Sequence, residues 1–331
     1  MFISGEEFDF DGQAGVHSLG ILQRFNLPKV NRIQQEIYKS QAVLSQKQLD
    51  LTKHELSYQI SLSYIDLIFQ KQKYALAQSL IDAYQELSTM SEEKFRVGEI
   101  GKLSVITAQE QVKIATWKKE LWEQDQQLAL IKFNSWLQSD TDFDTDINAL
   151  PPPSDIQKQD ITKHPLVQYY QQTQQVANAK VGATKSQSLP QLQTGLQLQT
   201  VNGKFLFYGY QLGVNVQLFK KSQNTKIEAA ELQVQISQAQ SEALAQHLTI
   251  KGHQLRAELQ NQLESLRYLE EEILPSIKER QGFAMASFRE GQASYLEYIQ
   301  STEQYFKYQL AFVETLKEFH LSQMELKYLL F

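Results

Sequence analysis

The chain lacks cysteine and is poor in the residues that interrupt helices. Its 331 residues include no Cys, 7 Pro and 14 Gly. The absence of cysteine excludes disulfides and thiolate metal sites. No apolar run reaches the roughly 18 residues that a membrane-spanning helix needs. The formal net charge is −6 and there is no Lys/Arg cluster, which argues against a nucleic-acid partner.

Glycine and proline mark the ends of the predicted helices. Neither residue occurs between Asn31 and Val97, where apolar residues recur at three- and four-residue steps. This pattern predicts a helix over 31–97 that would extend roughly 100 Å. Helices in compact domains average about 11 to 12 residues, so we expect an elongated protein. Further helices are predicted over 102–137, 165–187, 222–289 and 295–330, the third of these interrupted at Gly252, Pro275 and Gly282.

Two segments alternate with the period of β-strands. The block 189–219 carries an Asn-Gly turn signal at Asn202-Gly203 and predicts a hairpin. A third strand is predicted over 14–28, although Leu22 and Gln23 break its alternation. One face of these strands is apolar and aromatic while the other carries Gln, Asn and Gly, which is typical of a transmembrane β-barrel and also possible in a soluble half-buried sheet. For a barrel, the predicted lipid-facing residues are Leu19, Ile21, Phe25, Leu192, Leu196, Leu198, Leu206, Tyr208, Tyr210, Leu212, Val214, Val216 and Leu218.

The chain repeats itself at two turns. Gly98 and Gly291 lie 193 positions apart (291 − 98), and each follows a Phe-Arg-x sequence and precedes a matching series of Leu, Ile, Glu and Gln. Such internal repetition predicts two similar large hairpins. The first repeat would cover 1–138 with a tip turn at 98–101, and the second would cover 163–331 with a tip turn at 290–294. An acidic and Pro-rich linker over 139–162 would separate them.

Catalytic, cofactor and metal sites find no support. The series Asp140, Asp142, Asp144 and Asp146 begins like a calcium loop, but it lacks the Gly and the final Glu that such a loop needs. The six histidines form no i, i+4 pair, and there is no phosphate-binding loop or nucleophile–base pattern. We therefore predict a protein that is not an enzyme, without catalytic residues, metal or cofactor.

The order of these elements resembles that of the TolC-type outer-membrane efflux channels. The match rests on the two tip sequences, on Ile273-Leu274-Pro275 before the second tip, and on His164-Pro165-Leu166 ahead of Leu189-Pro190-Gln191-Leu192. The resemblance implies a mainly α fold with a small β part: long antiparallel helical hairpins and transmembrane β-barrel strands in two tandem repeats. It also implies a homotrimer in the Gram-negative outer membrane, with the helices projecting into the periplasm.

The resemblance implies particular partners and sites as well. The tips would dock onto a periplasmic adaptor and an inner-membrane pump through Val97, Gly98, Glu99, Ile100, Gly101, Glu290, Gly291, Gln292, Ala293 and Ser294. Glu297 matches a position where the family narrows the entrance with acidic residues, and Ser104 is its counterpart in the first repeat. Three copies of Glu297 would give a ring that favours cations, whereas an ordinary exposed carboxylate is the alternative. Phe95 and Phe288 are candidates for tip packing or for a gate.

Some alternatives stay open at this point. Metal cations and drugs are both possible cargo, and the segment Ser4–Pro28 looks most like family members that serve heavy-metal pumps of the RND type. The rival to a channel is a periplasmic adaptor or another soluble coiled-coil interaction protein. The first residues lack a secretory signal, and the first repeat would lack its initial helix and strand, leaving three of four strands. We therefore expect an N-terminally truncated or fused chain.

Overall fold

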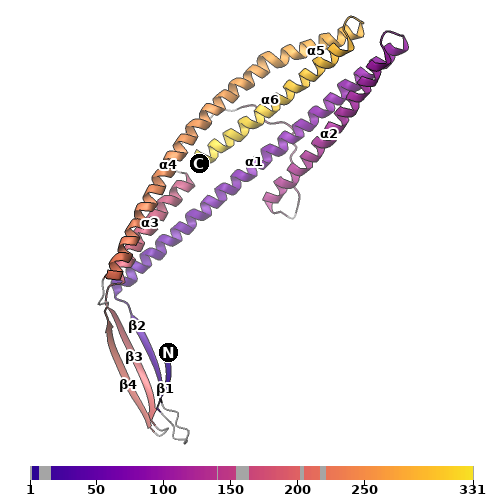
Figure 1. Ribbon diagram of the computed structural model, residues 1–331. Coiled ribbons are helices and arrows are strands. Elements are labelled where there is room, and N and C mark those ends of the chain that lie inside the picture. The colour runs from indigo at the N-terminus through magenta and orange to yellow at the C-terminus, as the bar shows by residue number, and fades with distance from the viewer. Residues whose placement is uncertain are drawn as a thin grey trace. The chain divides into compact units, whose positions relative to one another are not determined.

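The fold consists of long helices and one small sheet (Figure 1). The computed structural model describes residues 2–6, 16–139, 141–153, 164–201, 205–216 and 221–330. These fall into two compact units, one made of Met1–Leu51 with Pro165–Ala245 and the other of Thr52–His164 with Gln246–Phe331. Each unit therefore combines segments from both predicted sequence repeats, and the division into repeats stays a prediction.

The first unit contains a four-stranded antiparallel sheet in the order β1-β2-β3-β4. Its strands are β1 (Phe2–Glu6), β2 (Val16–Phe25), β3 (Gln191–Val201) and β4 (Phe205–Asn215). Strands β3 and β4 pair as the predicted hairpin, and β2 joins the two halves of the chain by pairing with β3 from Phe25↔Leu192 to His17↔Thr200.

The expectation of only three strands was wrong. Phe2–Glu6 form β1, which pairs with β2 from Phe2↔Gly20 to Glu6↔Val16. Five residues with glycine at the fourth position carry too weak an alternation to predict a strand. β1 depends on the backbone partner that β2 offers, and a pairing between separate segments cannot be seen in local sequence.

Polar contacts join the helices of the first unit. α1 (Pro28–Arg96) begins here, together with α3 (Pro165–Ser186) and the first part of α4 (Lys221–Tyr268). The Gln172 amide donates to the Ser40 carbonyl at 3.0 Å, and the Gln223 amide donates to the Thr184 carbonyl. Both glutamines are buried, so their hydrogen bonds fix how α3 lies between α1 and α4.

The second unit packs helices from both halves of the chain around apolar clusters. It holds the later part of α1, α2 (Lys102–Leu137), the rest of α4, a short π-helix (Leu269–Ile273), α5 (Leu274–Arg289) and α6 (Tyr295–Leu330). The largest cluster joins α1, α4 and α6, and a second joins α1, α2, α5 and α6 toward the turns. Burial of these apolar side chains stabilises the unit.

Two of the three expected interruptions of the long helix before the second turn are absent. Gly252 and Gly282 lie inside α4 and α5, because a helix held by neighbouring helices tolerates a single glycine. The third interruption is real but has its own geometry. Pro275 stands near the start of α5, directly after the π-helix Leu269–Ile273. The wider turn of the π-helix makes room for the proline ring and adapts to the backbone N–H that proline lacks.

The described part of the linker is a strap bound to the helices. The Asp144 carboxylate pairs with Lys71 at 2.7 Å, and this contact lowers the pKa of Asp144. Asn134 makes two hydrogen bonds to the backbone of Phe143, and Leu150 lies in the largest apolar cluster. Asp140 lies outside the described residues. Asp144 thus serves an ion pair to α1, in keeping with an acidic linker.

Two histidines hold the end of α6. The Nε2 atoms of His54 and His164 both donate to the Tyr328 carbonyl, at 2.8 and 2.7 Å. This carbonyl belongs to the last turn of α6, which has no partner within its own helix. The Tyr328 ring stacks on His54 and on Tyr58. His164 is fully buried, and burial lowers its pKa from the ordinary 6.5.

Acidification should destabilise the fold around His164, because its buried ring would have to take up a charge. The pKa of His164 is lower in the folded state than in the unfolded state, so the unfolded chain binds more protons at pH values between these two pKa values. The stability from neutral His164 is therefore fully present above about pH 6.5 and is lost as the pH falls through the folded pKa. We expect the melting temperature, followed by circular dichroism, to fall between about pH 7.5 and about pH 5.5. The fall should be smaller in His164→Gln, and an equal fall in both proteins would contradict this assignment.

Candidate docking turns and the apolar sheet face

The first turn is a Schellman motif that ends α1. The Glu99 amide donates to the Lys94 carbonyl at 2.9 Å, and the Gly98 amide donates to the Phe95 carbonyl at 3.0 Å. Gly98 has φ +81°, the left-handed conformation that this motif requires at its central residue. Val97, Gly98, Glu99 and Gly101 are exposed and Ile100 is half-buried.

The second turn has the same hydrogen-bond pattern at equivalent residues. The Gln292 amide donates to the Ser287 carbonyl at 2.8 Å, and the Gly291 amide donates to the Phe288 carbonyl at 3.2 Å. Gly291 has φ +74°. Ala293, the counterpart of Ile100, is again the half-buried residue, while Glu290, Gly291, Gln292 and Ser294 are exposed. Sequence repetition has therefore produced two turns of one geometry.

The two helical hairpins contact one another near their turns. Arg289 forms an ion pair with Glu86 and also donates from Nε to the Met90 sulfur at 3.4 Å. The Lys94 ammonium lies 5.6 Å from the centre of the Phe288 ring and pairs with Glu99 at 2.6 Å. Neither Arg289 nor Lys94 was assigned a role from the sequence, because their partners lie in the other hairpin or beyond the turn.

The two phenylalanines have different environments. Phe288 is 1% exposed and stacks on Tyr298, with ring centres 5.9 Å apart. Phe95 is 40% exposed, and the Lys102 ammonium lies 5.3 Å from its ring centre. Phe288 therefore belongs to the core behind the turn, and Phe95 lies on the surface of the first turn.

Glu297 forms a capping box with Ser294 at the start of α6. The Ser294 amide donates to the Glu297 carboxylate at 2.7 Å, and the Glu297 amide donates to the Ser294 hydroxyl oxygen at 3.2 Å. These bonds satisfy amides that a helix start leaves without partners, and the backbone bond lowers the pKa of Glu297. The Ser-x-x-Glu spacing was visible in the sequence and could have predicted this role.

The first turn lacks this device. Gly101 and Ser104 occupy the equivalent positions, and Gly101 makes no side-chain cap. The Ser104 amide instead donates to the Gly101 carbonyl at 3.1 Å. The start of α2 is therefore held less tightly than the start of α6, so the two turns share a backbone but differ in charge and in capping.

The predicted apolar strand residues share one exposed face of the sheet. The register aligns Leu19 with Leu198 and Tyr208, and it aligns Ile21 with Leu196 and Tyr210. Opposite residues of antiparallel strands lie on the same face. Tyr208 is 88% exposed, and all the described members are exposed: Leu19, Ile21, Phe25, Leu192, Leu196, Leu198, Tyr208, Tyr210, Leu212, Val214 and Val216. Leu218 and the side chain of Leu206 lie outside the described residues.

The opposite face is mostly small and polar. Gly20, Gln197 and Gly209 align across three strands. Leu22, which interrupts the pattern in the sequence, also lies on this face, opposite Gly195. A Cβ atom at Gly195 would come within 2.9 Å of the Leu22 side chain and 3.1 Å of the Ile21 carbonyl. Gly195 thus provides the space that lets β2 continue past Leu22 without a break.

Solved structures with this arrangement include outer-membrane channels. The chain superposes on CusC with a TM-score of 0.83, at 15% identity over 99% of this chain and 81% of that one. It superposes on the channel OprN with a TM-score of 0.82, at 14% identity over 99% of this chain and 79% of that one. It superposes on the open state of the Neisseria gonorrhoeae MtrE channel with a TM-score of 0.80, at 13% identity over 99% of this chain and 79% of that one. The chain shares the fold of these channels.

This likeness confirms the resemblance for the fold: mainly helical with a small sheet. No protein-family model and no curated protein matches the chain in sequence. Among the described residues, no helix is long and apolar enough to cross a membrane. The same part of the chain contains no group of three His, Asp or Glu residues placed to hold a metal ion.

The positive φ of the turn glycine predicts that two glycine-to-alanine substitutions change the stability in opposite directions. Replacing Gly291 by Ala should destabilise the protein by about 1 kcal/mol, because a Cβ atom strains a left-handed residue. Replacing Gly282 by Ala should instead stabilise it by up to about 1 kcal/mol, since Gly282 is helical with open space around its Cα. Denaturant unfolding measures both changes. Equal effects of the two substitutions would contradict the assigned turn conformation.

Proposed function

We propose that the chain is a subunit of an outer-membrane export channel in a Gram-negative bacterium. It would be a passive conduit of a tripartite efflux system, without catalysis of its own, with the sheet in the outer membrane and the helices in the periplasm. The observation that carries this proposal is the sheet, whose exposed apolar and aromatic face backs onto a face of Gln, Gly and Ser.

Such a sheet fits lipid on one side and water on the other. Soluble proteins rarely expose a continuous apolar patch of this kind, whereas barrel strands alternate apolar side chains toward lipid with polar ones toward the lumen. Tyr208 and Tyr210 lie side by side with Leu198 and Leu196 on that face, and tyrosine suits the interface between lipid and water.

Several copies would be needed to close the barrel. Within the described strands, β1 and β4 each have a partner on one side only. Unpaired backbone groups are costly in lipid, so the edges must meet other strands. In a homotrimer, three chains of four strands would supply twelve, an even number suited to an antiparallel barrel.

An exposed stripe on α2 also fits assembly. Its members follow one another at steps of three or four residues, with Glu110 and Gln124 filling the gaps, and such spacing marks a helix face that packs against another helix. All of them are exposed in the single chain: Leu103, Ile106, Ile114, Trp117, Leu121, Leu128 and Ile131. A helix of a neighbouring copy would cover this stripe.

The turns would form the contact with a periplasmic adaptor, through Val97–Gly101 and Glu290–Ser294. Leu103 and Leu296, equivalent residues just after the two turns, are 76% and 60% exposed, and Val97 is 70% exposed. Apolar side chains at the same place in both hairpins suit a partner that meets each in the same way. The pump behind that adaptor, of the heavy-metal RND type or another, would set the cargo, with metal cations and drugs as the candidate classes.

Reconstitution in planar lipid bilayers tests the channel function. We expect the purified protein to require detergent and to form ion-conducting pores in the bilayer, since the apolar face must be covered and the polar face would line water. A chain that stays monodisperse without detergent and conducts no current would contradict the proposal and favour a soluble coiled-coil protein.

Glu297 would add a cation-favouring charge at the entrance, beside its capping role. Replacing Glu297 by Gln should lower the cation selectivity of single channels, because three carboxylates would be lost from the ring. Ser294→Ala is the matched control. It should weaken the start of α6 by about 1 kcal/mol while keeping the charge. If both variants alter selectivity equally, the effect comes from the cap and the charge ring is excluded.

A further inference from the structure

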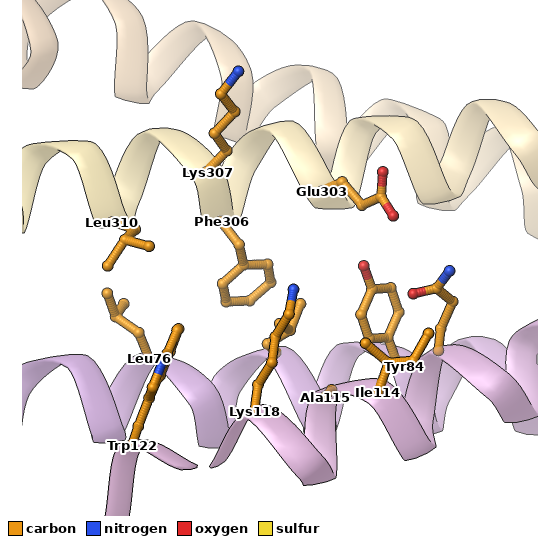
Figure 2. A pocket seen from close by; sticks show the side chains of 12 residues that line it. Leu76, Tyr84, Ile114, Ala115, Lys118, Trp122, Glu303, Phe306, Lys307 and Leu310 are labelled. Atoms are coloured by element: carbon orange, nitrogen blue, oxygen red, sulfur yellow. The ribbon is translucent and has the colours of Figure 1, made fainter. Parts of the chain in front are cut away.

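A pocket in the second unit lies between α1, α2 and α6 (Figure 2). Its volume is about 340 Å³. α1 contributes Leu76, Leu80 and Tyr84 at four-residue steps, so the three side chains lie on one face of that helix. This volume lies at the lower end of the range for small-molecule pockets, which begin at about 300 Å³. A helix, which is about 10–12 Å wide, would not fit into it, so the pocket suits a small molecule.

One end of the pocket is apolar and aromatic. Leu76 and Trp122 face Phe306 and Leu310 across the gap between the helices (Figure 2). The floor is buried, since Leu80 is 8% exposed and Ala115 is 1% exposed. An apolar body placed here would lose contact with water on several sides.

The hydroxyl of a largely buried tyrosine points into the other end. Tyr84 is 3% exposed, and its hydroxyl is directed into the space between α1 and α6 (Figure 2). It makes no hydrogen bond within the part of the chain that the structure describes. Burial, and then the charge of Glu303, raise the pKa of Tyr84, so its hydroxyl stays protonated. The Tyr84 side chain is buried as a whole, but its hydroxyl oxygen is accessible from the pocket, where it can donate a hydrogen bond to a ligand.

The pocket also contains an ammonium group without a partner. Lys118 extends into the gap beside Phe306 (Figure 2) and forms no ion pair with any described residue. Glu303 and Lys307 lie one turn apart on α6 in the order in which opposite charges offset each other on a helix. Lys118, Glu303 and Lys307 are all exposed, and none of them forms an ion pair with a described residue, so the lining carries two positive charges and one negative charge.

We propose that this pocket binds an amphipathic monoanion, with its apolar body against Trp122, Phe306 and Leu310 and its anionic group on the Lys118 ammonium. The Tyr84 hydroxyl would donate a hydrogen bond to the same anionic group. Because α1 and α2 line one side and α6 the other, the ligand would link the two helical hairpins and stabilise their contact by mass action. This inference does not depend on the channel function.

The test uses a fluorescent aryl sulfonate and its uncharged parent. The purified full chain is titrated with anilinonaphthalene sulfonate and, separately, with N-phenylnaphthylamine, and the same solution without protein gives the background. We expect saturable binding of the sulfonate, weakened about tenfold in Lys118→Gln, as loss of a charge-assisted contact predicts. The uncharged probe should bind with the same affinity to both proteins.

Two further variants separate the parts of the site. Leu310→Trp, which fills the apolar end, should weaken both probes. Lys113→Gln, which removes an exposed charge on α2 outside the pocket, should change neither. If Lys118→Gln binds the sulfonate as the native chain does, or if Lys113→Gln weakens it equally, the site is excluded. Binding of a cationic probe that is lost in Glu303→Gln would also overturn the proposed charge preference.

Discussion

The unpaired edges of the sheet are the constraint on which the rest of the molecule depends. β2 and β3 have partners on both sides, while β1 and β4, as far as the described strands show, each have one. In water, solvent could satisfy such an edge, but the exposed apolar face makes lipid the better surroundings for this sheet. In lipid an open edge is too costly to persist. The proposed barrel, shared between copies, would resolve both demands, and contacts between copies would also account for the exposed apolar stripe on α2.

The contacts between the helices and at the turns have a different role, because they keep the long helices in fixed pairs. Apolar clusters supply most of the stabilisation, and single polar contacts set the geometry at a few places. Two histidines hold the last turn of α6, Asp144 in the linker pairs with Lys71, and a capping box begins α6. Because the first turn has no such cap, the two turns would offer a partner the same backbone with different stiffness and charge.

Sequence patterns located most elements because glycine and proline stand near helix ends and period-two alternation marks strands. The helix expected over 31–97 is observed over Pro28–Arg96, and those expected over 102–137 and 295–330 begin at Lys102 and Tyr295. β1 was missed because its pairing with β2 is not encoded locally. The contacts of Arg289 and Lys94, and the pocket, depend on residues far apart in the chain. The capping role of Glu297 was readable from Ser294, but the family resemblance drew attention to its charge instead.

Disulfide crosslinking of the two edge strands tests the shared barrel most directly, since the native chain has no cysteine. One cysteine replaces Ser4 in β1 and a second is placed in turn along β4, beginning at Gly209. Within one chain these edges are three strand spacings apart, about 14 Å, which is too far for a disulfide. Oxidation of the membrane-embedded protein should therefore join only different chains, in a ladder that ends at three. The absence of crosslinks along all of β4, or a ladder that continues beyond three, would contradict a closed trimeric barrel.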